Sequence, residues 1–203
     1  MNAVIVDSVE VIPSKIVCVG RNYVEHIKEL NNEIPTSMVV FMKPNSALTS
    51  KLYLFSEPIH YEGEISFLIR QGKIFAVAFG LDLTNRKLQS ELKEKGLPWE
   101  RAKAFDSAAV MSEFVSIEPS NIDKLSMQLW INGVLIQDAN IDLMIYKPQT
   151  IIDEINSFST LVDNDIVMTG TPKGVGIYYK GDRFTGKIFL EGKEIISHTW
   201  IVE

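Results

Sequence analysis

Three dipeptides that end in glycine, each between two apolar segments, constrain the fold of this chain more than any other feature. They are Gln71-Gly72, Asn132-Gly133 and Glu191-Gly192. A two-residue connection with glycine second is typical of a tight β-hairpin, and Asn-Gly is the strongest signal of this kind. The strands that these turns predict are residues 62–70 with 73–82, 125–131 with 134–137, and 183–190 with 194–202. Hairpins in this number favour a β-rich fold over a doubly wound parallel sheet.

Shorter patterns add three strands and three helices to the hairpins. Apolar, β-branched runs predict buried strands at 16–20, 38–42 and 165–169. The expected helices run from a cap at Asn22 to about Leu30, from a cap at Thr84 or Asn85 to near Gly96, and from Thr150 to Phe158, with Pro148 where the first turn would begin. Residues 31–35 are expected to end the first helix. With no repeat or linker, the pattern predicts one mixed α/β, β-rich domain over residues 1–203.

Two glutamates one residue apart, Glu62 and Glu64, open a strand of the first hairpin. Alternate side chains of a strand point to the same side of the sheet, and the hairpin brings Asp82 back toward both glutamates. Three carboxylates without Cys or His at matching spacing suit Mg²⁺, Mn²⁺ or Ca²⁺ rather than zinc. The alternative is a solvated strand face, because charged residues are mostly exposed.

Several other side chains could carry chemistry, and each also has a simpler explanation. His26 and Glu29 stand three residues apart on the expected first helix, which suits either an acid–base pair or an incidental surface pair. Lys43, Arg86 and Lys103 could bind anions or lie on the surface.

The segment from Thr169 to Gly176 could present backbone amides to a carboxylate, or it could be a plain turn rich in Gly and Pro. It lacks the order of a nucleotide phosphate loop. The chain also has no Gly-x-Gly-x-x-Gly ahead of a helix and no Gly-x-Ser-x-Gly. Dinucleotide binding and serine-nucleophile chemistry therefore have no support.

Composition narrows the class of protein. Hydrophobic residues make up 46% of the 203 residues and charged residues 23%, which is the balance of a globular protein. The net charge of −6 lacks the basic footprint of nucleic-acid binding, and no apolar run predicts a membrane partner. Cys18 is the only cysteine, so no internal disulfide can form, and we expect a cytoplasmic protein.

Six motif fragments follow one another over nearly the whole chain. They are Cys18-Val19-Gly20-Arg21-Asn22-Tyr23 with His26 and Glu29, Phe41-Met42-Lys43-Pro44, Tyr61-Glu62-Gly63-Glu64, Gly80 to Gln89, Pro98-Trp99 with Lys103, Phe105 and Asp106, and Thr169-Gly170-Thr171-Pro172 with Gly174-Val175. This series resembles the fumarylacetoacetate hydrolase family, specifically its small single-domain members related to acylpyruvases.

The resemblance implies a β-roll of mixed sheets with a few short helices, usually assembled as a dimer. It implies a divalent cation, Mg²⁺ or Mn²⁺ with Ca²⁺ also possible. The site residues that it implies are Glu62, Glu64 and Asp82 for the metal, His26, Glu29 and Lys103 for catalysis, and Arg21, Lys43, Arg86, Gln89 and Thr171 for the substrate. His26 and Glu29 would belong to a lid that orders over bound substrate.

The family's chemistry implies a 2-keto acid substrate whose enolate is stabilised by the cation. The leading expectation is hydrolysis of a C–C bond in an acylpyruvate by water that His26 and Glu29 activate. Decarboxylation or tautomerisation of oxaloacetate, isomerisation or decarboxylation of unsaturated keto-diacids, and a non-catalytic metal-binding domain stay open. Two departures from the pattern concern the pocket: Gly63 replaces a larger residue, and residues 107–112 lack the family's Pro-x-Gly-Pro.

Overall fold

The computed structural model of the protein describes residues 1–29 and 36–203. The predicted end of the first helix, at Leu30 and residues 31–35, lies outside the described residues. The described helices are α1 (Val24–Glu29), α2 (Arg86–Glu94), α3 (Glu100–Lys103) and α4 (Pro148–Phe158), with 3-10 turns η1 (Asn45–Ala47), η2 (Pro119–Lys124) and η3 (Ile141–Leu143). None of them is long and apolar enough to cross a lipid bilayer.

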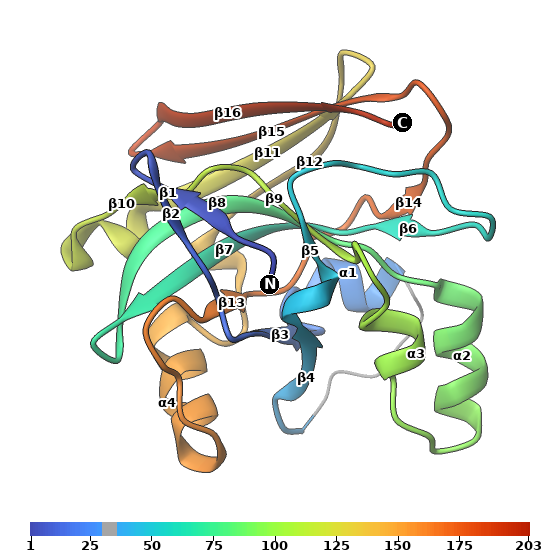
Figure 1. The fold of residues 1–203 in the computed structure, drawn as a ribbon, viewed down its shortest axis with the longest axis horizontal. Helices are drawn as coiled ribbons and strands as arrows, with labels where there is room; N and C mark the ends of the chain where they lie inside the picture. Colours follow the sequence, from blue (N-terminus) through green and yellow to red (C-terminus); the bar gives the residue numbers. More distant parts are fainter. Residues whose placement is uncertain (30–35) are drawn as a thin grey trace.

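An eight-stranded mixed sheet forms the larger layer of the fold (Figure 1). Its main path runs β4 (Val39–Pro44), β3 (Lys15–Gly20), β13 (Ile166–Met168), β7 (Gly63–Arg70), β8 (Lys73–Asp82), β9 (Ala109–Met111) and β5 (Leu48–Thr49), and β10 (Val115–Ser116) pairs with β8. β13 runs parallel to β3 and antiparallel to β7. The predicted β-rich mixed α/β class is confirmed.

The predicted hairpin at Gln71-Gly72 forms the centre of this sheet. Arg70 pairs with Lys73 across the turn, and Gln71 and Gly72 both adopt positive φ, at 52° and 69°. Positive φ at both central residues is the geometry of a type I′ turn, whose twist matches that of the strands. The register then shifts by one residue between Leu68 and Ile69, and this shift places Glu64 at the start of β7 opposite Gly80 near the end of β8.

A four-stranded antiparallel sheet packs over the larger one and appears as the upper layer in Figure 1. Its order is β12 (Val134–Asn140), β11 (Leu125–Ile131), β15 (Arg183–Leu190) and β16 (Lys193–Ile201). The two remaining two-stranded sheets pair β1 (Val4–Val6) with β2 (Val9–Val11) and β14 (Gly176–Ile177) with β6 (His60–Tyr61).

The two main layers meet at an aromatic contact. Phe79 of β8 is fully buried, and its ring lies 6.2 Å from that of Trp200. A Cβ on Gly186 would stand 2.4 Å from the Phe79 ring, so glycine is required at this close approach. A second apolar cluster, with Cys18, Leu68 and Met168 among its members, covers the other face of the large sheet. Burial on both faces explains why β7 is apolar from Ile65 to Ile69 except at Ser66.

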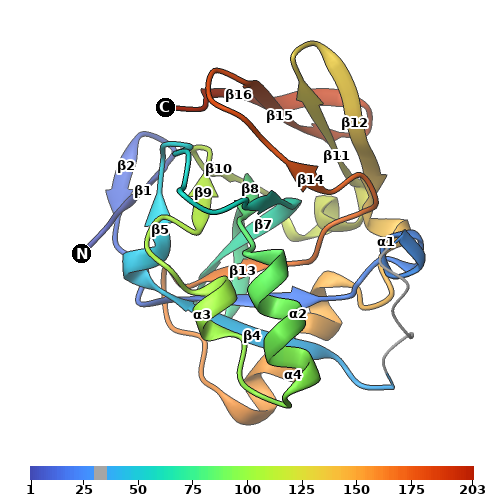
Figure 2. The same ribbon diagram turned by 90° about the vertical axis from the view of Figure 1, so that its right-hand side faces the viewer.

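Helices α2 and α3 lie side by side near β4 (Figures 1 and 2), and α4 stands apart from them in Figure 1. The predicted cap of α2 is Asn85, whose side chain accepts from the Leu88 amide at 3.0 Å. The short helix α3 was not predicted from the sequence. It carries Lys103 at its last position, beneath the mouth of the site described next.

Candidate active site

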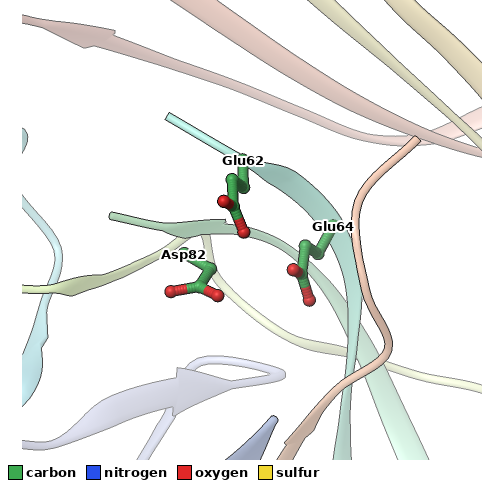
Figure 3. Close-up of side chains that lie close together, drawn as sticks. All are labelled: Glu62, Glu64 and Asp82. Atoms are coloured by element: carbon green, nitrogen blue, oxygen red, sulfur yellow. The ribbon is translucent and has the colours of Figure 1, made fainter. Parts of the chain in front are cut away.

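Glu62, Glu64 and Asp82 converge as the sequence predicted (Figure 3). One carboxylate oxygen from each lies within 4.8 Å of the others, and all three side chains are buried. The Asp82 amide donates to the Glu62 carbonyl at 2.9 Å, which clamps the end of β8 to the residue before β7. Glu64 stands opposite Gly80 in the register of this hairpin. The cluster is therefore a product of the hairpin, of its turn and its register shift together, and it is no solvated strand face.

Lys103 neutralises two of these carboxylates. Its Nζ donates to Glu62 Oε2 at 2.9 Å, to Asp82 Oδ2 at 2.6 Å and to Thr84 Oγ1 at 2.6 Å. Burial on its own lowers the pKa of Lys103, but Asp82 and Glu62 outweigh burial and raise the pKa above its ordinary value. Lys103 is therefore a permanent cation at the edge of the cluster.

Lys43 lies behind the cluster rather than in the cavity. Its side chain is fully buried, and its Nζ donates to the carbonyls of Leu83, Lys103 and Ala108. Those three bonds use all the N–H groups of an ammonium. Asp82 Oδ1 lies 2.8 Å from Nζ and still accepts no hydrogen bond, so this ion pair is a charge contact only. The structure thus places Lys43 as a support for Asp82 and leaves a buried oxygen of Asp82 able to bind a cation.

Glu64 has too little positive charge around it. Its Oε2 accepts one hydrogen bond, from the Gly170 amide at 2.8 Å. Burial, followed by the charges of Asp82 and Glu62, raises the pKa of Glu64 well above its ordinary value. A hard divalent cation would offset this repulsion, and an all-oxygen donor set is what Mg²⁺ and Mn²⁺ prefer. The residues present therefore fit a divalent metal ion.

The helix α1 brings His26 and Glu29 to the same place. His26 Nδ1 lies 3.3 Å from Glu29 Oε2, and Glu29 Oε1 accepts from the Gly174 amide at 3.0 Å. Burial lowers the pKa of His26, although Glu62 and Glu29 oppose that effect. The imidazole is therefore neutral near pH 7, and Glu29 orients it by binding Nδ1, which leaves Nε2 for proton transfer.

The cavity between these groups is small, about 30 Å³. It is lined by Gly20, Arg21, His26, Phe41, Glu62, Arg86, Gln89, Lys93, Trp99 and Lys103. Arg86 pairs with Glu62, and its Nη1 donates to Gln89 Oε1 at 2.8 Å. A hollow of about 680 Å³ opens at the far end of the β7–β8 hairpin, but it lacks the acidic cluster and the His26–Glu29 pair. The small cavity is the candidate active site because His26, Glu62 and Lys103 line it.

Thr171 and the loop around it are joined to β7 by Gln137, which the sequence did not single out. The Gln137 side chain accepts from the Gly63 amide at 3.0 Å and donates to Thr171 Oγ1 at 2.9 Å. A Cβ on Gly63 would stand 2.6 Å from Gln137 Oε1, which explains glycine between the two glutamates. The sequence does contain a signal for Gln137. Gln137 and Ala139 are two residues apart on one strand, so they point to the same buried side, and a buried amide needs hydrogen-bond partners.

Lys93 is the second residue of the site that the sequence did not single out. Arg86, Gln89 and Lys93 follow at i, i+3 and i+7 on α2, so they share one face of the helix. Of the residues predicted for the site, the structure thus gathers all but Lys43 and Thr171 in or directly beside the cavity.

Comparison with known proteins shows which proteins this chain is similar to. A family model described as Fumarylacetoacetate (FAA) hydrolase C-terminal matches residues 15–199. The oxaloacetate tautomerase YcgM of Escherichia coli (strain K12) is 37% identical over 193 residues, which cover 85% of this chain and 87% of that protein. A crystal structure assigned as a fumarylacetoacetate isomerase/hydrolase of Oleispira antarctica covers 100% of both chains, with a TM-score of 0.94 and 35% identity.

A second solved structure contains ligands. The fumarylpyruvate hydrolase from Pseudomonas aeruginosa, in complex with Mn²⁺ and pyruvate, superposes with a TM-score of 0.87 at 28% identity. The match covers 100% of this chain and 96% of that chain.

Proposed function

This chain belongs to the fumarylacetoacetate hydrolase family, and we propose that it is a divalent-metal-dependent enzyme that interconverts the keto and enol forms of oxaloacetate. One observation carries the proposal: a buried histidine that is neutral near pH 7 lines the same cavity as Glu62, and Glu62 belongs to a buried cluster of three carboxylates. The tautomerase of E. coli at 37% identity supports the choice of reaction. The acylpyruvate hydrolysis expected from the sequence becomes the second candidate.

The residues divide the work of tautomerisation. Neutral His26 takes the proton from C3 of the keto acid through Nε2, and the electron pair of that C–H bond forms the C2–C3 double bond. Negative charge then develops on the keto oxygen, where Lys103 and Arg86 stabilise it. The oxygen then takes a proton from the His26 imidazolium, directly or through water, which gives the enol and restores neutral His26. A divalent cation, when bound, polarises the keto oxygen and makes the C3 proton more acidic. Glu29 keeps the imidazole in the required tautomer throughout.

Hydrolysis stays a candidate because the same pair can activate water. His26 oriented by Glu29 is the arrangement that a general base requires. The fumarylpyruvate hydrolase that superposes on this chain supports the same chemistry here. Mg²⁺ as the metal, a homodimer, a single catalytic domain and a cytoplasmic location are further proposals. They rest on the oxygen ligands, the family and the lone buried Cys18.

The test is a panel of 2-keto acids with purified protein and Mg²⁺ or Mn²⁺. We expect faster decay of the enol absorbance of oxaloacetate without release of pyruvate, and loss of that rate in His26→Ala. The variant should keep the rise in melting temperature that Mg²⁺ gives the parent protein, because His26 is no ligand. Cleavage of acetylpyruvate with no effect on oxaloacetate would instead establish the hydrolase. Pyruvate release from oxaloacetate would indicate a decarboxylase, and inactivity on the whole panel would indicate a metal-binding domain without catalysis.

A further inference from the structure

Lys93 is the one lysine of the cavity that has no role in the chemistry described above. It projects from the same face of α2 as Arg86 and Gln89, two turns from Arg86, and lines the cavity with His26 and Glu62. Its Nζ lies 5.1 Å from the centre of the Trp99 ring, which also lines the cavity. Its position is therefore set by an aromatic wall rather than by a carboxylate.

The charge around Lys93 is unbalanced. Lys43 and Lys103 each have an ion pair with Asp82, and Arg86 has one with Glu62. Among residues 1–29 and 36–203, Lys93 has no carboxylate partner of this kind. Burial, and then the nearby Arg21 and Arg86, lower the pKa of Lys93 to about 8. An anion that binds beside this half-buried ammonium would stabilise its charged form.

The carboxylate next to the keto group of a 2-keto acid does not supply an anion for Lys93. Its keto and carboxylate oxygens belong at the acidic cluster with Lys103 and Arg86, where the reaction occurs. A monocarboxylic keto acid would therefore leave Lys93 without an anion and would place an apolar end among cations. A second carboxylate on the same molecule would pair with Lys93 in a charge-assisted hydrogen bond, which is stronger than a neutral one.

We propose that Lys93 binds the second carboxylate of a dicarboxylic 2-keto acid and so makes the enzyme prefer dicarboxylates to monocarboxylates. The proposal rests on the proposed function, because it assumes that a 2-keto acid occupies this cavity. It identifies the residue that distinguishes oxaloacetate from smaller keto acids such as pyruvate and 2-oxobutanoate. Lys93→Met removes the charge and keeps the length of the side chain, and Lys93→Arg keeps the charge.

The experiment measures binding separately from turnover. Isothermal titration in Mg²⁺ compares 3,3-difluoro-oxaloacetate, which cannot enolise, with 2-oxobutanoate. We expect Lys93→Met to weaken the dicarboxylate about tenfold to a hundredfold, the range of a hydrogen bond to a charged group. The monocarboxylate should change less than about twofold, and Lys93→Arg should recover most of the dicarboxylate affinity.

The control is Lys87→Met, which removes the same charge from an exposed position on α2. It should leave both affinities unchanged, which separates a direct contact from a general effect of net charge. Equal weakening of both ligands by Lys93→Met, no weakening of either, or a parent protein that binds neither ligand would overturn the proposal. If the parent binds both ligands selectively but does not accelerate the enol decay of oxaloacetate, the proposed function fails and the role of Lys93 stands.

Discussion

Replacing Gln137 by leucine tests how the site is held together. The side chain of Gln137 accepts from the Gly63 amide at 3.0 Å and donates to Thr171 Oγ1 and the Pro172 carbonyl at 2.9 Å each. It thus ties the strand that carries Glu64 to the loop that also binds Glu29. Leucine has a similar size and removes all three bonds.

The size of the effect follows from the groups left behind. The buried Gly63 amide loses its Gln137 partner, and a buried group without a partner costs about 1–3 kcal/mol. The Pro172 carbonyl keeps a bond from Thr171 Oγ1 at 3.4 Å, so the loss there is that of one hydrogen bond, about 0.5–1.5 kcal/mol. Burying the leucine side chain returns about 1 kcal/mol, since Gln137 is only 1% exposed and its methylene groups are buried already. We therefore expect Gln137→Leu to lower the free energy of unfolding by about 0.5–3.5 kcal/mol.

Urea unfolding followed by tryptophan fluorescence gives this free energy, with the metal chelated so that only the protein contributes. Gln149→Leu is the matched control, because Gln149 is exposed on α4 and its bond to Asp153 Oδ1 lies in solvent. It should change the free energy of unfolding by less than about 0.5 kcal/mol. A Gln137→Leu protein as stable as the control would refute the conclusion that this side chain joins strand and loop.

Three further predictions concern the metal, the loop and the pH dependence. Glu64→Gln should raise the melting temperature of the metal-free protein at pH 8, because burial and then Asp82 and Glu62 raise the pKa of Glu64 and make its charged form costly. It should also abolish the gain from Mg²⁺, about 2.7 kcal/mol for the parent at a hundred times Kd, and a retained gain would exclude Glu64 as a ligand. Gly170→Ala should cost about 1–3 kcal/mol in urea unfolding, because φ is +97° and the new Cβ would stand 2.8 Å from the Asn22 Cβ; unchanged stability would contradict this. Burial lowers the pKa of His26 below 6.5, so kcat/KM should rise with pH through that lowered pKa and be flat above it. For the same reason, the contribution of His26 to stability is present above its unfolded pKa and is lost as pH falls toward its folded pKa. An acid limb of kcat/KM centred above pH 6.5 would disprove that His26 is the base.

Local turn chemistry explains why the hairpins could be predicted. The bounds 73–82, 125–131 and 183–190 agree with β8, β11 and β15, because an Xaa-Gly pair fixes the turn and the pairing directly beside it. Each hairpin then has a register shift within its strands that the turn does not predict. The hairpin of β1 and β2 escaped prediction because Asp7 and Ser8 adopt positive φ, at 47° and 70°, without a glycine. The insertion of β13 between β3 and β7 depends on contacts far apart in the chain, which no local pattern encodes.

The candidate site divides in the same way. The meeting of Glu62, Glu64 and Asp82 could be predicted because one hairpin carries all three. The burial of Lys43 could not, since it depends on carbonyls of three other segments of the chain. Lys93 could have been found from its spacing to Arg86 on α2, but its lack of an ion pair with any carboxylate of residues 1–29 and 36–203 is a property of the folded protein.

The closeness in sequence of the three carboxylates has a consequence for the order in which the molecule assembles. Hairpins form in about 1–10 μs, much sooner than pairings between distant segments such as Ile166 with Ile16. The acidic side chains therefore meet while Lys43 and Lys103, on other elements, are still unattached. During that interval a divalent ion would offset the repulsion among the carboxylates, so the proposed metal would also help to assemble the central strands.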